Sequence, residues 1–140
     1  MADKRRKSRP VPRTQQLPVA DASGSTDDEH PLFCLRYLHP DHAVKSAGLD
    51  RKKRAAFAER LQELASQTWS QLRKSGRHSQ GFEFVDAAQI RPTLHGAFAD
   101  VDKVMVFRYA GLLPMVGVRN GRVYHVLAVE AQFGDVYDHG

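Results

Sequence analysis

Residues 116–129 read VGVRNGRVYHVLAV, and this stretch decides the architecture of the second half of the chain. Two runs rich in β-branched residues flank Asn120-Gly121, and both residues of this pair tolerate a positive φ. Asn-Gly between such runs is the strongest short-range signal for a β-hairpin with a type I′ turn. The sequence therefore predicts a two-residue loop at Asn120-Gly121, with Arg119 facing Arg122.

The predicted register divides the hairpin side chains between two faces of a sheet, because directly opposed residues share a face. One face is apolar, and we expect it to pack against a helix. It holds Val116, Val118, Val123, His125, Leu127 and Val129. The other face holds Gly117, Arg119, Arg122, Tyr124 and Glu130.

The strongest helical pattern lies between Asp50, which has the chemistry of an N-cap, and Gly76, which has that of a helix end. Apolar residues recur there at spacings of three and four, as in an amphipathic helix, and we expect Arg60 and its charged neighbours to face solvent. The apolar stripe consists of Phe57, Leu61, Leu64, Thr68 and Leu72, with Ala65 and Trp69 beside it.

Apolar runs at 32–38, 82–85 and 104–109 complete the set of predicted strands. The order is strand, helix, then several strands, with no second helix for a parallel crossover. This order predicts an α+β fold: an antiparallel β-sheet with one main α-helix packed on one face.

The first thirty residues differ from the rest because they contain no Phe, Trp, Tyr, Ile or Cys. Such a segment buries too little apolar surface to offset the entropy of ordering it. We therefore expect residues 1–30 to form a disordered basic and Pro-rich tail, and residues 31–140 to form a single α+β domain. The tail is either a tether for nucleic acid or an acidic surface, or a solvated extension without a partner.

The chain of 140 residues has a net charge of +5, and residues 31–140 supply +4 of it, with fifteen basic and eleven acidic side chains. A basic domain favours RNA or an acidic protein as partner. The same excess is also ordinary for a small soluble domain. Charge alone therefore leaves both interpretations open.

Several classes of chemistry find no support in the sequence. Cys34 is the only cysteine, so an internal disulfide is excluded, and its apolar surroundings indicate a buried side chain. Neither HExxH, a P-loop nor a GxSxG elbow occurs, and His39 and His42 are too few for a zinc site. We expect no metal, no cofactor, no membrane span and a location in the cytoplasm.

Three side chains are the candidates for catalysis. Arg108 lies in the predicted strand 104–109, and Tyr137 and His139 lie in the C-terminal sequence DVYDHG. Together they suit work on a phosphodiester: arginine stabilises charge developing on phosphate, histidine transfers protons, and tyrosine offers a stacking surface or a hydroxyl.

Each candidate also has a structural interpretation. A lone arginine in an apolar strand needs a partner, and Glu83, Glu130 or Asp135 could supply a carboxylate to Arg108. His125, on the apolar hairpin face, is more typical of a hydrogen-bonded core histidine than of a catalytic one.

A second set of residues suits nucleic-acid binding, because it combines positive charge with an aromatic ring. The arginines at the hairpin tip are equally typical of solvated charges, and a tyrosine opposite a glycine is typical of packing. The set consists of Lys74, Arg77, Arg119, Arg122 and Tyr124.

From Leu32 onward the arrangement resembles the RelE/ParE-like toxin superfamily, chiefly in the segment KVMVFRY at 103–109, the hairpin, and Tyr137 and His139. The resemblance implies a basic protein with helices ahead of an antiparallel sheet and an antitoxin as acidic partner. It also implies that Arg108, Tyr137 and His139 carry RNA cleavage. RelE-like toxins usually have a helical hairpin, whereas the sequence here predicts one helix.

The segment 107–140 is also similar to small bacterial proteins that end in a like Tyr-Asp-His-Gly sequence. Two functional hypotheses follow. The first is a non-catalytic binding module for nucleic acid or protein, which requires fewer coincidences. The alternative is a RelE-like, metal-independent, mRNA-cleaving toxin of a toxin-antitoxin pair.

Overall fold

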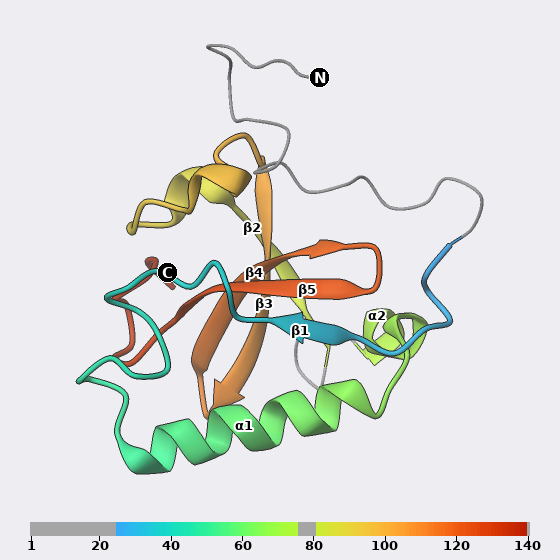
Figure 1. The fold of residues 1–140 in the computed structure, drawn as a ribbon, viewed down its shortest axis with the longest axis horizontal. Coiled ribbons are helices and arrows are strands. Elements are labelled where there is room, and N and C mark those ends of the chain that lie inside the picture. The colour runs from blue at the N-terminus through green and yellow to red at the C-terminus, as the bar shows by residue number, and fades with distance from the viewer. Residues whose placement is uncertain (1–24, 76–80, 140) are drawn as a thin grey trace, which may run out of the picture.

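A computed structural model of the chain describes residues 25–75 and 81–139, and the account below concerns these residues (Figure 1). The helices are α1 and α2, with short 3₁₀ helices η2 and η3 after the second strand. In chain order the elements are β1 (Leu32–Cys34), α1 (Arg51–Ala65), α2 (Trp69–Ser75), β2 (Glu83–Asp86), η2 (Ala87–Gln89), η3 (Gly96–Phe98), β3 (Lys103–Ala110), β4 (Leu113–Asn120) and β5 (Val123–Val129).

The strands form one five-stranded sheet in the order β1-β5-β4-β3-β2. The strands β2 to β5 are antiparallel neighbours, which confirms the predicted α+β class. The strand β1 differs from the prediction, since it runs parallel to β5 at one edge, with Leu32 beside Val123. The parallel pairing is feasible because two helices and three strands separate β1 from β5 in the sequence, a connection long enough to cross the sheet.

The helix α1 begins as predicted, because the Asp50 carboxylate accepts a hydrogen bond from the backbone N–H of Lys53 at 2.8 Å. Arg60 was expected in solvent, and this expectation is wrong. Its side chain is buried, and its Nε donates to the carbonyl oxygen of Arg108 on β3 at 2.8 Å. The aliphatic stem of an arginine can cover apolar surface while its head binds a polar atom, which explains the burial.

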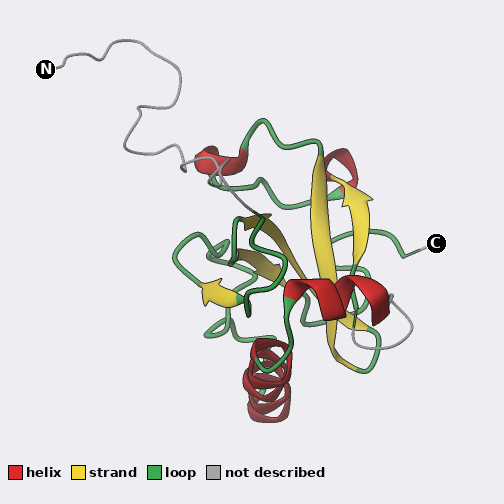
Figure 2. Ribbon diagram, turned by 90° about the vertical axis from the view of Figure 1, so that its right-hand side faces the viewer, coloured by secondary structure: helices red, strands yellow, loops and turns green. Residues whose placement is uncertain are grey.

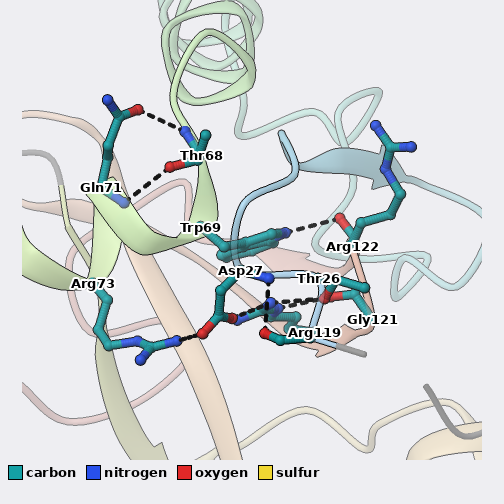
Figure 3. A network of polar contacts seen from close by, with 10 residues as sticks. Thr26, Asp27, Thr68, Trp69, Gln71, Arg73, Arg119, Gly121 and Arg122 are labelled. Atoms are coloured by element: carbon teal, nitrogen blue, oxygen red, sulfur yellow. Dashed lines mark hydrogen bonds and ion pairs between the residues drawn. The ribbon is translucent and has the colours of Figure 1, made fainter. Parts of the chain in front are cut away.

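The predicted single helix is interrupted, and a separate helix α2 follows. The Thr68 hydroxyl accepts from the N–H of Gln71 at 3.1 Å, and the Gln71 side chain accepts from the N–H of Thr68 at 2.8 Å (Figure 3). This reciprocal pair is a capping box, which starts a new helix with its own direction. The predicted helix end at Gly76 lies outside the described residues.

The hairpin forms, but its register differs by one position from the prediction. Asn120 pairs with Val123, so the loop residues are Gly121 and Arg122. Gly121 takes the positive φ of 65° that the turn needs. The carbonyl oxygen of Arg122 accepts hydrogen bonds from the first N–H of β1 and from the Trp69 indole, each at 3.0 Å. These tertiary contacts, which no local pattern encodes, hold Arg122 in the loop.

The helices cover the face of the sheet opposite to the one predicted. In both ribbon views α1 and α2 lie on one side of the strands, and the 3₁₀ segments lie on the other (Figures 1 and 2). Gly117 explains why the helices pack on this face of the sheet, because a Cβ at position 117 would lie 2.6 Å from the ring of Tyr124. The bare backbone lets this ring fill the helix side. Sheet residues facing the helices are Met105, Phe107, Tyr109, Met115, Tyr124 and Val126.

The valine-rich face is buried too, under the segments after β2 and the C-terminal segment. Val106 and Val116 pack with Ile90 of the connection and with the C-terminal residues Val136 and Tyr137. Leu127 packs with Tyr37 and Phe98. The sheet is therefore the middle of three layers.

The last residues of the predicted tail are packed on the domain (Figure 3). The carbonyl oxygens of Asp27 and Glu29 accept hydrogen bonds from the N–H groups of Ser70 and Trp69 at 2.8 and 3.1 Å. The first turn of a helix has unsatisfied N–H groups, and this segment satisfies two of them. The packed part of the chain thus begins before residue 31. The rest of the predicted tail, residues 1–24, lies outside the described residues.

Candidate functional site

A pocket of about 450 Å³ opens on the face of the sheet that α1 and α2 leave free. It lies where β2 and β3 meet the C-terminal segment. The structure brings the three candidate catalytic residues, Arg108, Tyr137 and His139, into its wall. The wall is completed by Gly81, Glu83, Val85, Gln89, Val106, Leu112, Pro114, Phe133 and Asp138.

His139 is held by a buried carboxylate. Its Nε2 lies 2.7 Å from Oε1 of Glu130, whose side chain has no solvent exposure. The second carboxylate oxygen of Glu130 accepts from the backbone N–H of Val136 at 2.9 Å. A carboxylate that binds one ring nitrogen fixes the tautomer and leaves the other nitrogen, Nδ1, for proton exchange.

Two aromatic rings hold His139 on its faces. Phe133 stacks on it with ring centroids 4.0 Å apart and an interplanar angle of 21°. Tyr137 lies 4.1 Å away at 37°. The imidazole therefore has little freedom to rotate, which is the condition for a positioned acid or base.

Arg108 reaches the pocket from β3 and is exposed. Two of the three carboxylates considered as its partner are engaged elsewhere: Glu130 binds His139, and Asp135 accepts from the backbone N–H of Gln132 at 3.2 Å. The third, Glu83, lines the same pocket as Arg108. Exposure in a pocket leaves the guanidinium available to an incoming anion.

Tyr137 is a neutral phenol at physiological pH. Burial, and then the charges of Glu83 and Glu130, raise its pKa to about 12, although Arg108 opposes this effect. Its hydroxyl is therefore a hydrogen-bond donor rather than a phenolate base.

Glu83 is a pocket residue that the sequence analysis did not place in the site. It lies on the edge strand β2, and its charge reaches Tyr137 strongly enough to raise the pKa of that hydroxyl. A signal for it existed: successive strand residues face opposite sides, so Glu83 between two phenylalanines must face away from their apolar layer.

The four described residues of the set proposed for nucleic-acid binding do not form one surface. Tyr124 is completely buried, and its hydroxyl donates to the carbonyl oxygen of Met105 at 2.7 Å, so its ring is not available to stack on a base. Lys74 is exposed at the end of α2. Arg77 lies outside the described residues.

The two hairpin arginines bind the segment that precedes β1, and Figure 3 shows the contacts of Arg119. Arg119 donates to the Asp27 carboxylate at 2.8 Å and lies over the Trp69 ring, 4.4 Å from its centroid. Arg122 forms a 3.0 Å ion pair with Glu29. Asp27 also binds Arg73, and hydrogen bonds from Arg119 and Arg73 lower the pKa of its carboxyl group. The interpretation of Arg119 and Arg122 as solvated charges at a hairpin tip is therefore wrong, because both bind acidic side chains of this segment.

His125 is buried, as expected of a core histidine, but its Nδ1 has no hydrogen-bond partner among the described residues. Instead its ring contacts those of Tyr37 and Phe98, with centroids 5.6 and 5.4 Å away. Burial lowers the pKa of His125. Cys34 is half-buried, rather than fully buried as predicted.

Within residues 25–75 and 81–139, no three side chains of His, Cys, Asp or Glu form a group that could hold a metal ion. In the same part of the chain, no helix has the length and apolar character that crossing a bilayer requires.

Comparisons of the chain with protein-family models, with curated proteins and with solved structures found no match. The fold and the site define an α+β protein with a polar pocket on one side of its sheet. The pocket residues are therefore the basis for a functional proposal.

Proposed function

We propose that the pocket binds single-stranded RNA and cleaves it without a metal ion, as an endoribonuclease of RelE type. The observation that carries the proposal is the convergence of Arg108, Glu83 and His139 on one pocket, with His139 fixed by Glu130. These are an anion binder and two groups that exchange protons, as transfer at a phosphodiester requires.

In the proposed reaction the 2′-hydroxyl of a nucleotide attacks the adjacent phosphorus atom. The Glu83 carboxylate accepts the hydroxyl proton as the new O–P bond forms. Arg108 stabilises the charge on the pentacovalent phosphate. The protonated His139 gives a proton to the departing 5′-oxygen, and the O–P bond to that oxygen breaks. The products are a 2′,3′-cyclic phosphate and a free 5′-hydroxyl.

One feature of the fold and one side chain in the pocket support the likeness to RelE-type proteins. The sequence predicted one helix, whereas the structure has α1 and α2 between β1 and the other strands. This removes one departure from the pattern. Tyr137, a neutral donor beside Arg108, is suited to hold a phosphate oxygen or the ribose.

A non-catalytic module that binds nucleic acid or protein at another part of the surface is the second candidate, because Glu83 and Asp138 in the pocket wall count against RNA in the pocket itself. Negative side chains in the wall oppose tight binding of a polyanion in this pocket. An acidic protein partner would meet the same repulsion here. A partner of either kind would have to bind elsewhere on the surface.

The test is expression of the full chain alone in bacteria, with growth and translation as readouts, together with the purified protein and single-stranded RNA in the presence of EDTA. We expect growth arrest, and RNA fragments that end in cyclic phosphate. Arg108→Ala should lose ~10²–10³ in rate, as for other electrostatic stabilisers. Because Arg108 is exposed, this variant should keep the thermal stability of the parent.

Lys52→Ala is the matched control, since it removes an exposed cation from α1, outside the pocket wall. It should cleave RNA at the parental rate. A parent protein that neither stops growth nor produces cyclic-phosphate ends would exclude the enzyme and leave the binding module.

A further inference from the structure

A second hollow, of about 390 Å³, lies on the helix side of the sheet beside the edge strand β2. Alternate residues of this strand line different pockets. Glu83 faces the candidate active site, whereas Phe82 and Phe84 line the second hollow. The two hollows therefore lie on either side of a single edge strand.

Phe84 is an exposed aromatic platform. Its side chain is 58% exposed, and it shares the hollow with the apolar side chains of Phe82, Met105 and Val118. A contiguous apolar patch with a polar rim is typical of an interaction site, whereas a single exposed apolar side chain is not. Phe82 supports the ring edge-on, with centroids 5.5 Å apart, and Phe82 in turn contacts Trp69 and Phe107. The exposed ring is thus anchored to the core.

The polar wall of the hollow is entirely cationic, with Arg73, Lys103 and Arg119. Its anionic neighbours are few: Asp86 pairs with Lys103 at 2.6 Å, and Asp27 binds both arginines (Figure 3). The pairs of Lys103 and Arg73 are solvent-exposed, and such pairs hold their partners weakly. A polyanion can therefore compete for these cations.

We propose that this hollow is a second RNA subsite, in which a base stacks on Phe84 and a phosphate binds Lys103 and Arg73. Aromatic rings flanked by cations are the usual means of binding single-stranded nucleic acid without sequence preference. A strand that occupies both hollows would pass around the edge of β2. The choice of RNA rests on the proposed function, whereas binding at this subsite requires no cleavage.

The experiment measures binding of the full chain to a fluorescent oligouridylate of about twelve nucleotides. Every ribose carries a 2′-O-methyl group, so no 2′-hydroxyl is available and the probe cannot be cut. Phe84→Ala should weaken binding at low salt by roughly fivefold or more, as loss of one stacked base does. Lys103→Ala should weaken it and lower the salt dependence by about one phosphate contact.

Matched control variants accompany these changes. Leu32→Ala removes an exposed apolar side chain from β1, at the opposite edge of the sheet, and should bind as the parent does. Asp86→Asn releases Lys103 from its pair and should tighten binding, whereas Asp41→Asn makes the same charge change in an exposed turn outside the lining of the hollow and should tighten it less. Phe84→Leu retains bulk without the ring and guards against a folding defect in Phe84→Ala.

Cleavage of a dinucleoside phosphate separates the two proposals, because so short a substrate fills the first pocket alone. Phe84→Ala should cut it at the parental rate while cutting long RNA more slowly. Loss of long-RNA binding in Phe84→Ala, with a parent that never cleaves, would support the subsite and exclude the enzyme. Equal binding by Phe84→Ala and Leu32→Ala would overturn the subsite, as would a parent that binds an acidic peptide but no RNA.

Discussion

The imidazole of His139 and the carboxylate of Glu130 form a 2.7 Å contact at the base of the pocket, and Glu130 has no solvent exposure at all. A buried carboxylate without a partner is costly, so the contact contributes to folding as well as to orientation. A change at position 139 therefore affects stability and chemistry together, and the two effects need separate variants.

His139→Ala should destabilise the protein by about 1–3 kcal/mol or more, because it leaves Oε1 of the buried Glu130 without its side-chain partner while Oε2 keeps the Val136 N–H. His139→Gln retains an N–H donor for the carboxylate and should lose much less, while its amide cannot transfer protons. Thermal unfolding of both variants checks the expectation. If both unfold at the parental temperature, Glu130 does not depend on His139.

The same pair supplies the sharper test of catalysis. A folded His139→Gln protein should lose ~10²–10⁴ in the rate of RNA cleavage, the usual cost of removing a general acid. Full activity in this variant would exclude His139 from the reaction, whatever the behaviour of the alanine variant.

Stability should fall in mild acid, with His125 as one source. Burial lowers its pKa below the ordinary value of 6.5, so the folded protein disfavours the proton that the unfolded chain accepts. The contribution of neutral His125 is complete above pH 6.5 and is lost as the pH falls toward the folded pKa. Urea midpoints at about pH 7.5 and pH 5.5 should therefore differ less in His125→Phe than in the parent. If the change in urea midpoint between the two pH values is the same in His125→Phe and in the parent, groups other than His125 cause the loss of stability in acid.

Local patterns predicted the elements well where a single interaction decides the outcome. Asp50 caps α1 because a carboxylate three residues before an open N–H is sufficient for a cap. Strands β3 and β5 follow from runs of β-branched and aromatic residues. Arg108, Tyr137 and His139 were selected for their chemistry, and the structure places them in one pocket.

The failures come from contacts between distant parts of the chain. The hairpin loop is Gly121-Arg122 instead of the predicted Asn120-Gly121, because Trp69 and β1 bind the Arg122 carbonyl oxygen. The hairpin sequence alone does not show these contacts. Glu130 was read as a polar-face residue, and its role depends on a histidine nine positions later. Long-range partners of this kind override local preference, and one sequence does not show them.

Gly117 should tolerate no side chain. A Cβ at this position would lie 2.6 Å from the Tyr124 ring and would also strike the backbone of β5. Gly117→Ala should therefore destabilise the protein by about 1–3 kcal/mol, the range for overpacking a core. Gly96→Ala is the matched control, since nothing lies within 4 Å of the added atom. Urea unfolding of the two variants should separate them, and equal midpoints would mean that both the Tyr124 ring and the β5 backbone can shift.

The segment 25–30 should belong to the cooperative unit. It supplies two carbonyl groups to the start of α2, and its Asp27 and Glu29 pair with Arg119 and Arg122. A protein that begins at residue 31 should therefore unfold at lower temperature than one that begins at residue 25, by several degrees for each kcal/mol lost. Both proteins lack residues 1–24, so their difference reports on this segment alone. Asp27→Asn in the longer protein should cause part of this loss of stability at neutral pH. The difference between Asp27→Asn and its parent should shrink as the pH falls below about 4, because only an ionised Asp27 gains from the two arginines. Identical unfolding of the two truncated proteins would place the start of the stable domain at residue 31 after all.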